Sequence, residues 1–569
     1  MSLIQPSQIQ QRSFEPSVVK TLTEQGIPSL LAQLLVQRGV NKTSDIKQSL
    51  QELPHWTQLK GIHEASNCLL KAVIEQQKII IIADYDADGA TACAVAIRAL
   101  RAMGAKVDYV VPNRMTMGYG LTPEVVDLAF RKHAEVLITV DNGIASTQGV
   151  DYANQLGLTV IITDHHLPGD QLPKAAAIVN PNQPNCPFPG KALAGVGVIF
   201  YVMLALRHAL KTHGVLSEER TPNLAKLLDL VALGTVADLA SLDADNRLLV
   251  QEGLKRIRQG FMQPGIRALL QVAGKDFRRL QSSDLGFSLG PRINAAGRMD
   301  DMTIGIECLI TERADHALLL AEQLNHFNQD RKFVEQSMQQ EALDQLDTLT
   351  VNEQLTLCLY DENWHPGVVG LVASRLKEKY HRPVFAFANN IEDSTIRGSG
   401  RSIPGFHLRD ALDVISKRYP QMIERFGGHA AAAGASIYKN QFEAFTKAFE
   451  EVAQLFLTED MLTQRVFYDL VLDAQDITLT LAEQCEQSVW GQNFPSPLFL
   501  GEFTVIEQRL VGEKHSKLVV SMRERQFQGI YFNHTDPLPH QVKLLFRVSN
   551  NEWNGRSQLQ LEITHWCHV

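Results

Sequence analysis

Acidic residues follow three short, almost continuously apolar segments of the chain, at 79–83, 136–140 and 160–163. The residues directly after these segments are Asp84 and Asp86, then Asp141, then Asp164 with His165 and His166. Apolar segments of this length that alternate with amphipathic helical segments are typical of parallel strands covered on both faces. Neighbouring parallel strands end at one edge of the sheet, where α/β proteins bind ligands. We therefore expect these carboxylates and imidazoles to converge.

Such a cluster is unstable without a counter-charge, because like charges a few Å apart repel one another. Carboxylate oxygens with one or two imidazoles suit Mn²⁺ or Mg²⁺ better than structural zinc. Two such ions, roughly 3.5–4 Å apart, commonly clamp a phosphate ester during displacement. The sequence thus predicts a site for two divalent cations, Mn²⁺ or Mg²⁺, that acts on phosphate.

A simpler interpretation exists for each acidic residue taken singly. An aspartate after a strand often caps the next helix. Asp238 follows an apolar segment at 227–235 that predicts a buried helix, and could be either a capped helix end or a further ligand. The metal interpretation rests on three strand ends with two adjacent histidines and five aspartates, namely Asp84, Asp86, Asp88, Asp141 and Asp164.

Changes in residue pattern divide the rest of the chain into segments. Residues up to about 55 are polar and irregular, with short helical pieces, and form an N-terminal arm. Residues 314–347 contain neither Pro nor Gly and predict a long connecting helix, after which a second α/β unit begins near 355. From about 463, five or six alternating segments predict a small β-barrel, with an OB-fold as the first hypothesis.

Composition excludes several classes of protein. The 569 residues are 45% hydrophobic and 21% charged, with a formal net charge of -9. These values exclude global disorder, coiled coil and collagen, and any nucleic-acid partner must meet a local basic patch. The seven cysteines form no CxxC pair, which argues against a thiolate zinc site or a disulfide framework. With no membrane-spanning run or signal peptide, the sequence predicts a cytoplasmic protein.

The ordered motifs DYDADG, VDNG, DHH and GTVAD resemble those of the DHH phosphoesterase superfamily. GSGRS and GGHAAAAG resemble its DHHA1 companion domain, and PRINAAGRM and WHPGVVGLVASRL lie between. The resemblance extends from about 56 to 569. It implies an α/β fold with five parts: an N-terminal arm (1–55), a parallel-sheet DHH domain (56–313), a connecting helix (314–347), a smaller α/β DHHA1 domain (348–460) and an OB-like barrel that binds nucleic acid (461–569).

The resemblance also implies roles for individual residues. The metal ligands would be Asp84, Asp86, Asp141, His165 and Asp238. Asp164 would orient the imidazole, and His166 would lie beside the scissile phosphate as a proton donor or a support. Asp88 could serve the turn rather than the metal.

Substrate contacts are expected on both sides of the connecting helix. In the DHH domain they are Asn294 and Arg298. In the DHHA1 domain they are His365, Arg375, Arg397, Ser399, Arg401, Ser402, Gly428 and His429. Trp364 could stack on a base or simply pack. Basic and aromatic residues interleave in the barrel, at Lys514, His515, Lys517, Arg523, Arg525, Phe527, Tyr531 and Phe532, as in a single-strand groove.

The implied activity is that of a single-stranded-DNA-specific 5′→3′ exonuclease that releases 5′-mononucleotides in DNA repair and recombination. The strand would thread between the two α/β units, and the expected enzyme is a monomer that meets single-stranded DNA and a single-strand-binding protein or helicase. One alternative is a DHH-family phosphodiesterase of short oligonucleotides or cyclic dinucleotides, or a pyrophosphatase, which needs no barrel. Another is a metal-free single-strand-binding scaffold. The polarity rests on the resemblance alone, and the sequence leaves DNA and RNA undistinguished.

Overall fold

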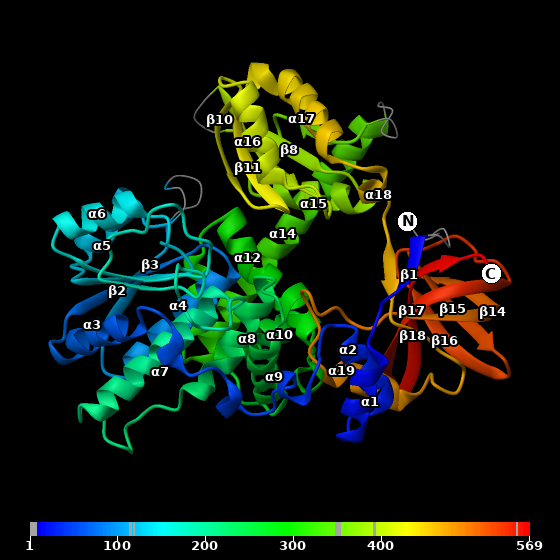
Figure 1. Ribbon diagram of the computed structural model, residues 1–569, viewed down its shortest axis with the longest axis horizontal. Coiled ribbons are helices and arrows are strands. Elements are labelled where there is room, and N and C mark those ends of the chain that lie inside the picture. Colours follow the sequence, from blue (N-terminus) through cyan, green and yellow to red (C-terminus); the bar gives the residue numbers. More distant parts are fainter. Residues whose placement is uncertain (1–7, 113–116, 118–119, 348–353, 391–393, 554–555) are drawn as a thin grey trace.

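The computed structural model describes residues 8–112, 117, 120–347, 354–390, 394–553 and 556–569. Figure 1 shows three sheet-containing bodies: a first α/β body whose sheet is blue and cyan, a second α/β body in yellow-green, and a barrel in orange and red. The helix α14 (Ala314–Asp347) runs between the first two bodies, as the sequence predicted.

The first sheet is entirely parallel, in the order β3-β2-β4-β5-β6. Its strands are β2 (Lys78–Ala83), β3 (Lys106–Val110), β4 (Val136–Val140), β5 (Thr159–Thr163) and β6 (Ala177–Val179). Alternate residues of β2 face opposite ways: Ile79 and Ile81 join one apolar core, and Ile80 and Ile82 join another. Both faces are buried, which explains why these strands are continuously apolar.

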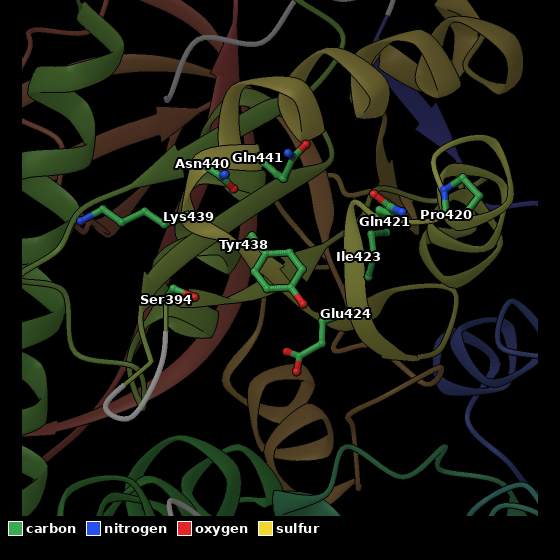
Figure 2. A pocket seen from close by; sticks show the side chains of 9 residues that line it. All are labelled: Ser394, Pro420, Gln421, Ile423, Glu424, Tyr438, Lys439, Asn440 and Gln441. Atoms are coloured by element: carbon green, nitrogen blue, oxygen red, sulfur yellow. The ribbon is translucent and has the colours of Figure 1, made fainter.

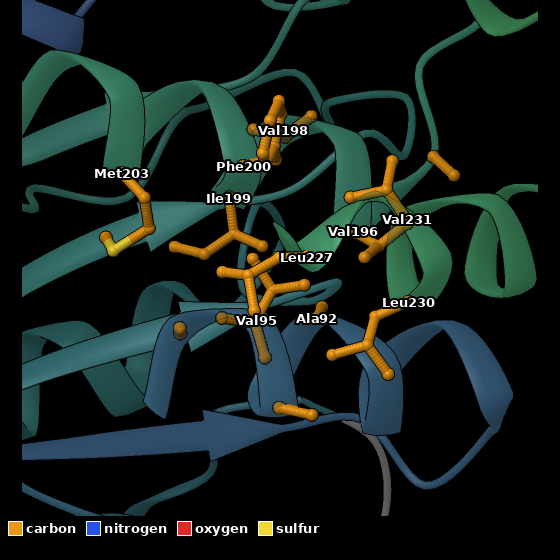
Figure 3. Packing of buried hydrophobic residues seen from close by; sticks show 14 of the residues in the cluster. Ala92, Val95, Val196, Val198, Ile199, Phe200, Met203, Leu227, Leu230 and Val231 are labelled. Atoms are coloured by element: carbon orange, nitrogen blue, oxygen red, sulfur yellow. The ribbon is translucent and has the colours of Figure 1, made fainter. Parts of the chain in front are cut away.

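Helices cover both faces of this sheet. On one side lie α3 (Ile62–Ile74), α4 (Ala87–Ala102) and α7 (Gly195–Thr212), and on the other α5 (Pro123–Arg131) and α6 (Thr147–Gln155). Helix α7 is apolar and long enough to cross a membrane, yet it is a largely buried core helix that packs on α3, α4 and α8 (Leu228–Ala237). Figure 3 shows this packing, with Val95 of α4, Ile199 of α7 and Leu230 of α8.

A helical layer extends the first body toward the barrel. It comprises α8, α9 (Ala244–Arg258), α10 (Pro264–Val272), the short α11 (Ser282–Asp284), a π-helical turn η7 (Leu285–Leu289), α12 (Gly290–Met299) and α13 (Thr303–Ile310). The first half of α14 packs on α10, α12 and α13. Its second half supplies Met338, Ala342 and Leu346 to a core shared with the second body, so one helix is built into both.

The second body contains a mixed sheet in the order β10-β11-β9-β8-β7. The strands are β7 (Leu357–Tyr360), β8 (Val384–Asn389), β9 (Thr395–Arg401), β10 (Ile423–Gly428) and β11 (Ala432–Tyr438), and only the β7–β8 pair is parallel. Its helices are α15 (Val369–Tyr380), α16 (Leu408–Arg418) and α17 (Phe442–Phe456), followed by the short α18 (Glu459–Leu462). This is the predicted second α/β unit.

The C-terminal body is a closed five-stranded barrel, as predicted. Its strands are β14 (Phe499–Val511), β15 (His515–Met522), β16 (Arg525–Tyr531), β17 (Gln541–Trp553) and β18 (Arg556–Cys567). Closure comes from pairing of β17 with both β18 and β14. The two-residue β13 (Leu470–Val471) pairs with β14, and α19 (Leu479–Gln487) packs on β17 and β18.

The N-terminal arm is more ordered than its polar sequence suggested. Its strand β1 (Ile9–Gln11) pairs in parallel with β12 (Val466–Tyr468), and the helices α1 (Pro16–Glu24) and α2 (Ser29–Val36) follow. Leu34 is buried in the barrel's core, and Arg38 forms a fully buried ion pair with Asp469 at 2.9 Å. Ala32 and Val36 of α2 join the core of the first body, so the arm fastens the barrel to that body.

Candidate metal centre and substrate site

The three predicted strand tips meet at one edge of the parallel sheet. The register pairs Ala83 with Val140 and Val140 with Thr163, so the next residues, Asp84, Asp141 and Asp164, lie side by side. Their backbone N–H groups extend the ladder, since Asp84 donates to Val140 at 3.3 Å and Asp141 to Thr163 at 3.1 Å. The predicted convergence of the strand-end aspartates is confirmed, and the register of the parallel strands is sufficient to produce it.

Ligand atoms from seven of the described residues form three overlapping groups, each within 4.8 Å: Asp84, Asp86 and Asp141; Asp88, His165 and Asp238; and Asp141, His165 and His166. His165 joins the groups, because its Nε2 lies 3.0 Å from Asp141 Oδ1 and 3.9 Å from Asp238 Oδ2. Asp238 lies at the end of the buried helix α8, as the 227–235 segment suggested.

Electrostatics argue that this cluster holds cations. Burial, together with the charges of neighbouring aspartates, raises the pKa of Asp141 and of Asp238 well above the usual range for carboxyls. Burial and the neighbouring His166 lower the pKa of His165 to about 4, so its imidazole is neutral near pH 7 and able to bind a metal. A set of buried carboxylates with one neutral imidazole fits Mn²⁺ or Mg²⁺.

Backbone geometry at Asp141 is unusual. Asp141 has a φ of 63°, in the left-handed region where non-glycine residues are strained. The turn is held by Asn142, whose side chain donates to the carbonyls of Ile82 and Val140 at 3.0 and 2.8 Å. Gly195 at the start of α7 packs so tightly that a Cβ there would lie 2.6 Å from Asp141 Oδ1. The position of this carboxylate is therefore fixed from three sides.

The helix-capping interpretation is also correct for Asp86. Its Oδ1 accepts the N–H groups of Asp88 and Gly89 at 2.9 and 3.0 Å, so it caps α4 as well as joining the ligand cluster. Asp88, whose role the motif left open, accepts the N–H groups of Gly195 and Val196 at 2.6 and 2.9 Å. It thereby ties the first motif to the N-terminus of α7, and burial with the charge of Asp86 raises its pKa to about 7.

Asp164 organises the histidine pair. Its Oδ1 accepts from the backbone of His165 and His166 and lies 2.7 Å from Nδ1 of His166, while Oδ2 accepts from Ile144 at 2.9 Å. Burial alone would raise the pKa of Asp164, but the hydrogen bond and charge of His166 lower it overall. Burial would lower the pKa of His166, but Asp164 raises it overall. The imidazole that Asp164 orients is that of His166.

One cavity of about 900 Å³ joins the metal centre to the second body. Asp84, Asp164 and His166 line one side and His429 lines another. The sequence did not single out its remaining polar lining from the loops at the starts of α5 and α6, which includes Thr122, Glu124, Ser146 and Thr147. The sequence pattern that could have located these loops is a helix-capping hydroxyl, such as that of Thr122, which accepts from the N–H of Val125 at 3.4 Å.

The expected substrate residues of the catalytic domain lie on α12. Asn294 accepts the N–H of Ala87 at 2.7 Å, which supports the first motif rather than leaving the amide oxygen open to substrate. Arg298 donates to the carbonyl of Gly367 at 3.0 Å, and His365 accepts the Gly367 N–H at 3.1 Å. Arg298 and His365 thus meet across the seam between the two α/β bodies.

On β9, alternation places Arg397, Ser399 and Arg401 on one face of the sheet. Arg401 donates to Ser399 Oγ at 2.9 Å, and the two pack under Gly370 near the start of α15. Gly428 has a φ of 138° and leads into His429. Arg401 at the end of β9 pairs with Ala432 at the start of β11, and the N–H of His429 donates to the carbonyl of Ala432 at 2.8 Å. His429 and Arg401 therefore lie at the same end of this strand pair.

Two expected contacts are engaged elsewhere. Ser402 is buried, and its hydroxyl donates to the carbonyl of Phe406 at 2.8 Å. Arg375 is paired with Glu335 of α14 at 3.0 Å, which braces the connecting helix. Trp364 is buried, and its Nε1 donates to Glu341 at 2.9 Å, so the packing interpretation is correct and the stacking one is wrong.

The predicted aromatic groove of the barrel needs the same correction. Phe527 and Tyr531 are buried in the barrel's core, because these positions of β16 face inward. Arg525 donates to the carbonyl of Ala474, and Arg523 pairs with Asp473 at 2.6 Å. The outer face keeps Lys514, His515, Lys517 and the exposed Phe532, whose ring lies 5.3 Å from that of His515.

A second, polar pocket lies at the opposite end of the second body's sheet. Figure 2 shows its lining, which includes Ser394, Glu424, Tyr438 and Lys439. The pairing of Tyr438 with Thr395 places it at the far end of β9 from Arg401. It contains none of the expected site residues.

Comparison with known proteins identifies the family. Three family models match in order: the DHH family N-terminal domain over residues 78–235, the DHHA1 domain over 352–455 and the RecJ OB domain over 468–565. The single-stranded-DNA-specific exonuclease RecJ of Escherichia coli strain K12 is 46% identical, over 98% of each chain. The chain belongs to the RecJ family.

Other RecJ proteins are also similar to this chain in sequence and in structure. The RecJ of Bacillus subtilis strain 168 is 35% identical, over 96% of this chain and 69% of its own length. The structure of Thermus thermophilus RecJ in complex with Mn²⁺ has a TM-score of 0.84 at 28% identity, and covers 99% of this chain and 80% of that one. The same RecJ in complex with Mg²⁺ has a TM-score of 0.78 at 27% identity, and covers 99% of this chain and 79% of that one. These are the two ions that the ligand cluster favours.

Proposed function

We propose that this chain is a metal-dependent exonuclease that degrades single-stranded DNA from its 5′ end and releases 5′-mononucleotides, in DNA repair and recombination. The observation that carries the proposal is the cavity in which Asp84 and His166 of the parallel sheet face His429 of the second body. A barrel is present, as a long-strand substrate requires and a small-molecule phosphodiesterase or pyrophosphatase does not. The intact acidic cluster argues against a metal-free scaffold.

We assign the ligand role for two divalent cations to Asp84, Asp86, Asp141, His165 and Asp238. Bound Mn²⁺ or Mg²⁺ would supply an ionised water and neutralise charge on the phosphate. Asp88 holds the ligand loop against α7 through Gly195 and Val196, and Asn294 holds it against α12 through Ala87. These contacts preset the carboxylate positions before substrate arrives.

His166 is assigned to the scissile phosphodiester. Its Nδ1 faces Asp164, so its Nε2 is the atom that can donate to a phosphate oxygen or to the departing 3′-oxygen of the terminal nucleotide. Asp164 fixes the ring and supports a proton on it, as a carboxylate partner does for a general acid. Cleavage of the P–O3′ bond with this proton leaves a 3′-hydroxyl on the released mononucleotide and a 5′-phosphate on the shortened strand.

The strand's terminus is assigned to the second body. This body offers two guanidinium groups, a hydroxyl, backbone N–H groups and an imidazole, from Arg397, Ser399, Arg401, Gly428 and His429. His429 lines the cavity, and Arg298 and His365 lie at the seam. Arg375 and Ser402 support this surface through Glu335 and Phe406 rather than by contact. Guanidinium groups suit phosphate oxygens because their paired donors match them.

The domain division supports threading of the strand. We propose the parts 1–55, 56–313, 314–347, 348–460 and 461–569, with the barrel gripping incoming DNA and α14 setting the spacing of the two α/β bodies. We further propose a monomer that works in the cytoplasm alongside a single-strand-binding protein or helicase. Seven free cysteines fit a reducing compartment.

The test is product analysis over time with Mn²⁺ on strands labelled at the 5′ or the 3′ end. The expected result is a labelled mononucleotide at the earliest times from the 5′-labelled strand, and a ladder from the 3′-labelled strand. A blunt duplex should resist attack and a 5′ tail should restore it. Equal rates on tailed and blunt duplexes, or mononucleotides released first from the 3′ end, would contradict the proposal.

A further inference from the structure

A cavity of about 550 Å³ lies in the first body, away from the metal centre. It is bounded by the C-terminal half of α4, the 3-10 helix η5 (Leu224–Leu227) and the residue before α10, and we call it the back cavity. Its apolar lining includes Ala102, Leu224 and Ile310. Pockets of this volume with an apolar lining commonly hold small organic molecules.

The charged lining of the back cavity is unbalanced. Arg98 donates through Nε to the carbonyl of Leu309 at 2.9 Å, and another of its guanidinium nitrogens is paired with Glu312. These two opposite charges therefore compensate each other. Arg101 and Lys226 also line the cavity, and neither forms an ion pair within the part of the chain that the structure describes. Two positive charges remain to attract an anion.

The wall opposite α4 is held in place by hydrogen bonds. The Gln263 side chain donates to the carbonyl of Lys226 at 2.8 Å, and its backbone N–H donates to Oδ2 of the buried Asp229 at 2.6 Å. Asn223 Oδ1 accepts the N–H of Ala225 at 3.1 Å and caps η5. A wall that is already ordered loses little conformational entropy when a ligand binds.

The back cavity and the metal centre lie at opposite ends of the same two helices. Helix α4 begins directly after Asp86 and carries Arg101 in its last turn, and its 16 residues span about 24 Å at about 1.5 Å per residue. Helix α8 ends at Asp238 and begins directly after Leu227, which lines the back cavity. Each helix therefore connects the cavity to a predicted metal ligand.

These two helices are packed tightly against each other. A Cβ on Gly234 of α8 would lie 2.2 Å from Thr91 Oγ1 of α4, so the backbones are in close approach. Figure 3 shows Val95 of α4 beside Leu227 and Leu230 at the start of α8. Close-packed interiors have low compressibility and transmit strain. A shift of one helix at the back cavity therefore changes the position of the ligands at the other end.

We propose that the back cavity is a regulatory site for a small organic phosphate monoester, such as a 5′-mononucleotide, and that its occupancy changes the affinity of the metal centre for divalent cations. A phosphate monoester carries about −1.5 to −2 charges at pH 7, which matches Arg101 and Lys226. Its organic part covers the apolar lining. The inference goes beyond the proposed function and does not depend on it.

The first experiment is calorimetry with dAMP as the probe, without divalent cations, on the full chain. The variant Arg101→Ala/Lys226→Ala should lose one equivalent of binding, or bind it at least about tenfold more weakly, because it lacks both uncompensated charges. The control Lys71→Ala/Arg131→Ala removes two charges from the last turns of α3 and α5 and should bind as the wild type does. Thermal melting checks that all three proteins are folded.

Two further probes separate the parts of the ligand. Deoxyadenosine lacks the phosphate and should not bind at this site. Inorganic phosphate should bind at least about tenfold more weakly than dAMP, because it leaves the apolar lining uncovered. Equal binding of dAMP by the wild type and the Arg101→Ala/Lys226→Ala variant, or inorganic phosphate that binds as tightly as dAMP, would overturn the inference.

The second experiment measures the affinity for Mn²⁺ by calorimetry, with and without saturating dAMP. The affinity of the wild type and of the control should shift by about fivefold or more, and that of Arg101→Ala/Lys226→Ala should shift much less. An effect of dAMP at the metal centre itself is common to all three proteins, so the difference reports on the back cavity. Equal shifts would overturn the coupling. A chain that fails to degrade single-stranded DNA would refute the proposed function and leave these binding results unaffected.

Discussion

His166 Nδ1 lies 2.7 Å from Asp164 Oδ1, and the same carboxylate accepts backbone N–H groups from His165 in its own loop and from Ile144 in the loop after β4. The pair therefore couples the orientation of one imidazole to the backbone of two neighbouring strand ends. This coupling makes Asp164 a positioning residue, with no direct contact to substrate required.

Asp164→Asn should reduce kcat about 10- to 100-fold, the usual cost of losing a group that orients a functional side chain. Asparagine keeps the size of the side chain but cannot accept from Ile144 and His166 as a carboxylate does. His166→Gln should reduce kcat as well. The double variant should have a kcat only slightly below that of the less active single variant. Losses that multiply in the double variant would show that the two residues act independently.

Asp141→Ala should abolish hydrolysis and leave binding of single-stranded DNA largely intact. The reason is that Asp141 lies between His165 and the Asp84–Asp86 pair at the centre of the ligand cluster. Thermal melting with and without Mn²⁺ should show stabilisation of the wild type and much less of the variant. Near-normal turnover of the variant would contradict the assignment of this cluster as the metal ligands for hydrolysis.

Gly195→Ala should lower kcat by about 100-fold, because its Cβ would lie 2.6 Å from Asp141 Oδ1 and push this carboxylate out of place. A misplacement of about 1 Å is enough to cost about 100-fold in rate. Gly197→Ala is the matched control two residues along α7, where the nearest atom is the flexible end of Leu193 at 3.1 Å. The control should keep activity within a few-fold. Equal losses in both variants would point to helix packing instead.

Arg401→Ala should weaken capture of the strand more than it weakens folding. The guanidinium positions Ser399 Oγ at 2.9 Å, so one substitution disturbs two groups on the β9 face. The rate at low strand concentration should fall at least tenfold, with little change in melting temperature. The comparison is Arg418→Ala, at the end of α16 on the same body. An unchanged rate at low strand concentration would remove the clamp role.

Metal binding should release protons, and affinity for Mn²⁺ should rise with pH. The pKa of Asp88 is raised to about 7 and those of Asp141 and Asp238 are raised as well, so the metal-free protein retains protons that the unfolded chain would lose. By linkage, the metal-free protein loses stability as pH rises above the ordinary carboxyl range, and cations reverse that loss. Calorimetry of Mn²⁺ binding in two buffers with different ionisation enthalpies measures the protons released; identical heats would contradict this prediction.

The sequence by itself determined the fold class, the order of the three bodies and the ligand cluster. Buried parallel strands must be continuously apolar, and the polar residues that end them must lie at one edge, so Asp84, Asp141 and Asp164 converge whatever the rest of the chain does. The helix at 314–347 was equally readable, because a long stretch free of Pro and Gly has few other conformations open to it.

Tertiary structure alone decided which polar and aromatic side chains remain available to a ligand. Alternation along β16 defines two faces, but barrel closure puts Phe527 and Tyr531 inside. Ser402 and Trp364 are buried and donate hydrogen bonds to Phe406 and Glu341, so they are not available to a ligand. Phe287 is exposed because it lies on a π-helical turn that packs on α8. Each outcome depends on contacts between segments distant in the chain, and local periodicity carries no information about such contacts.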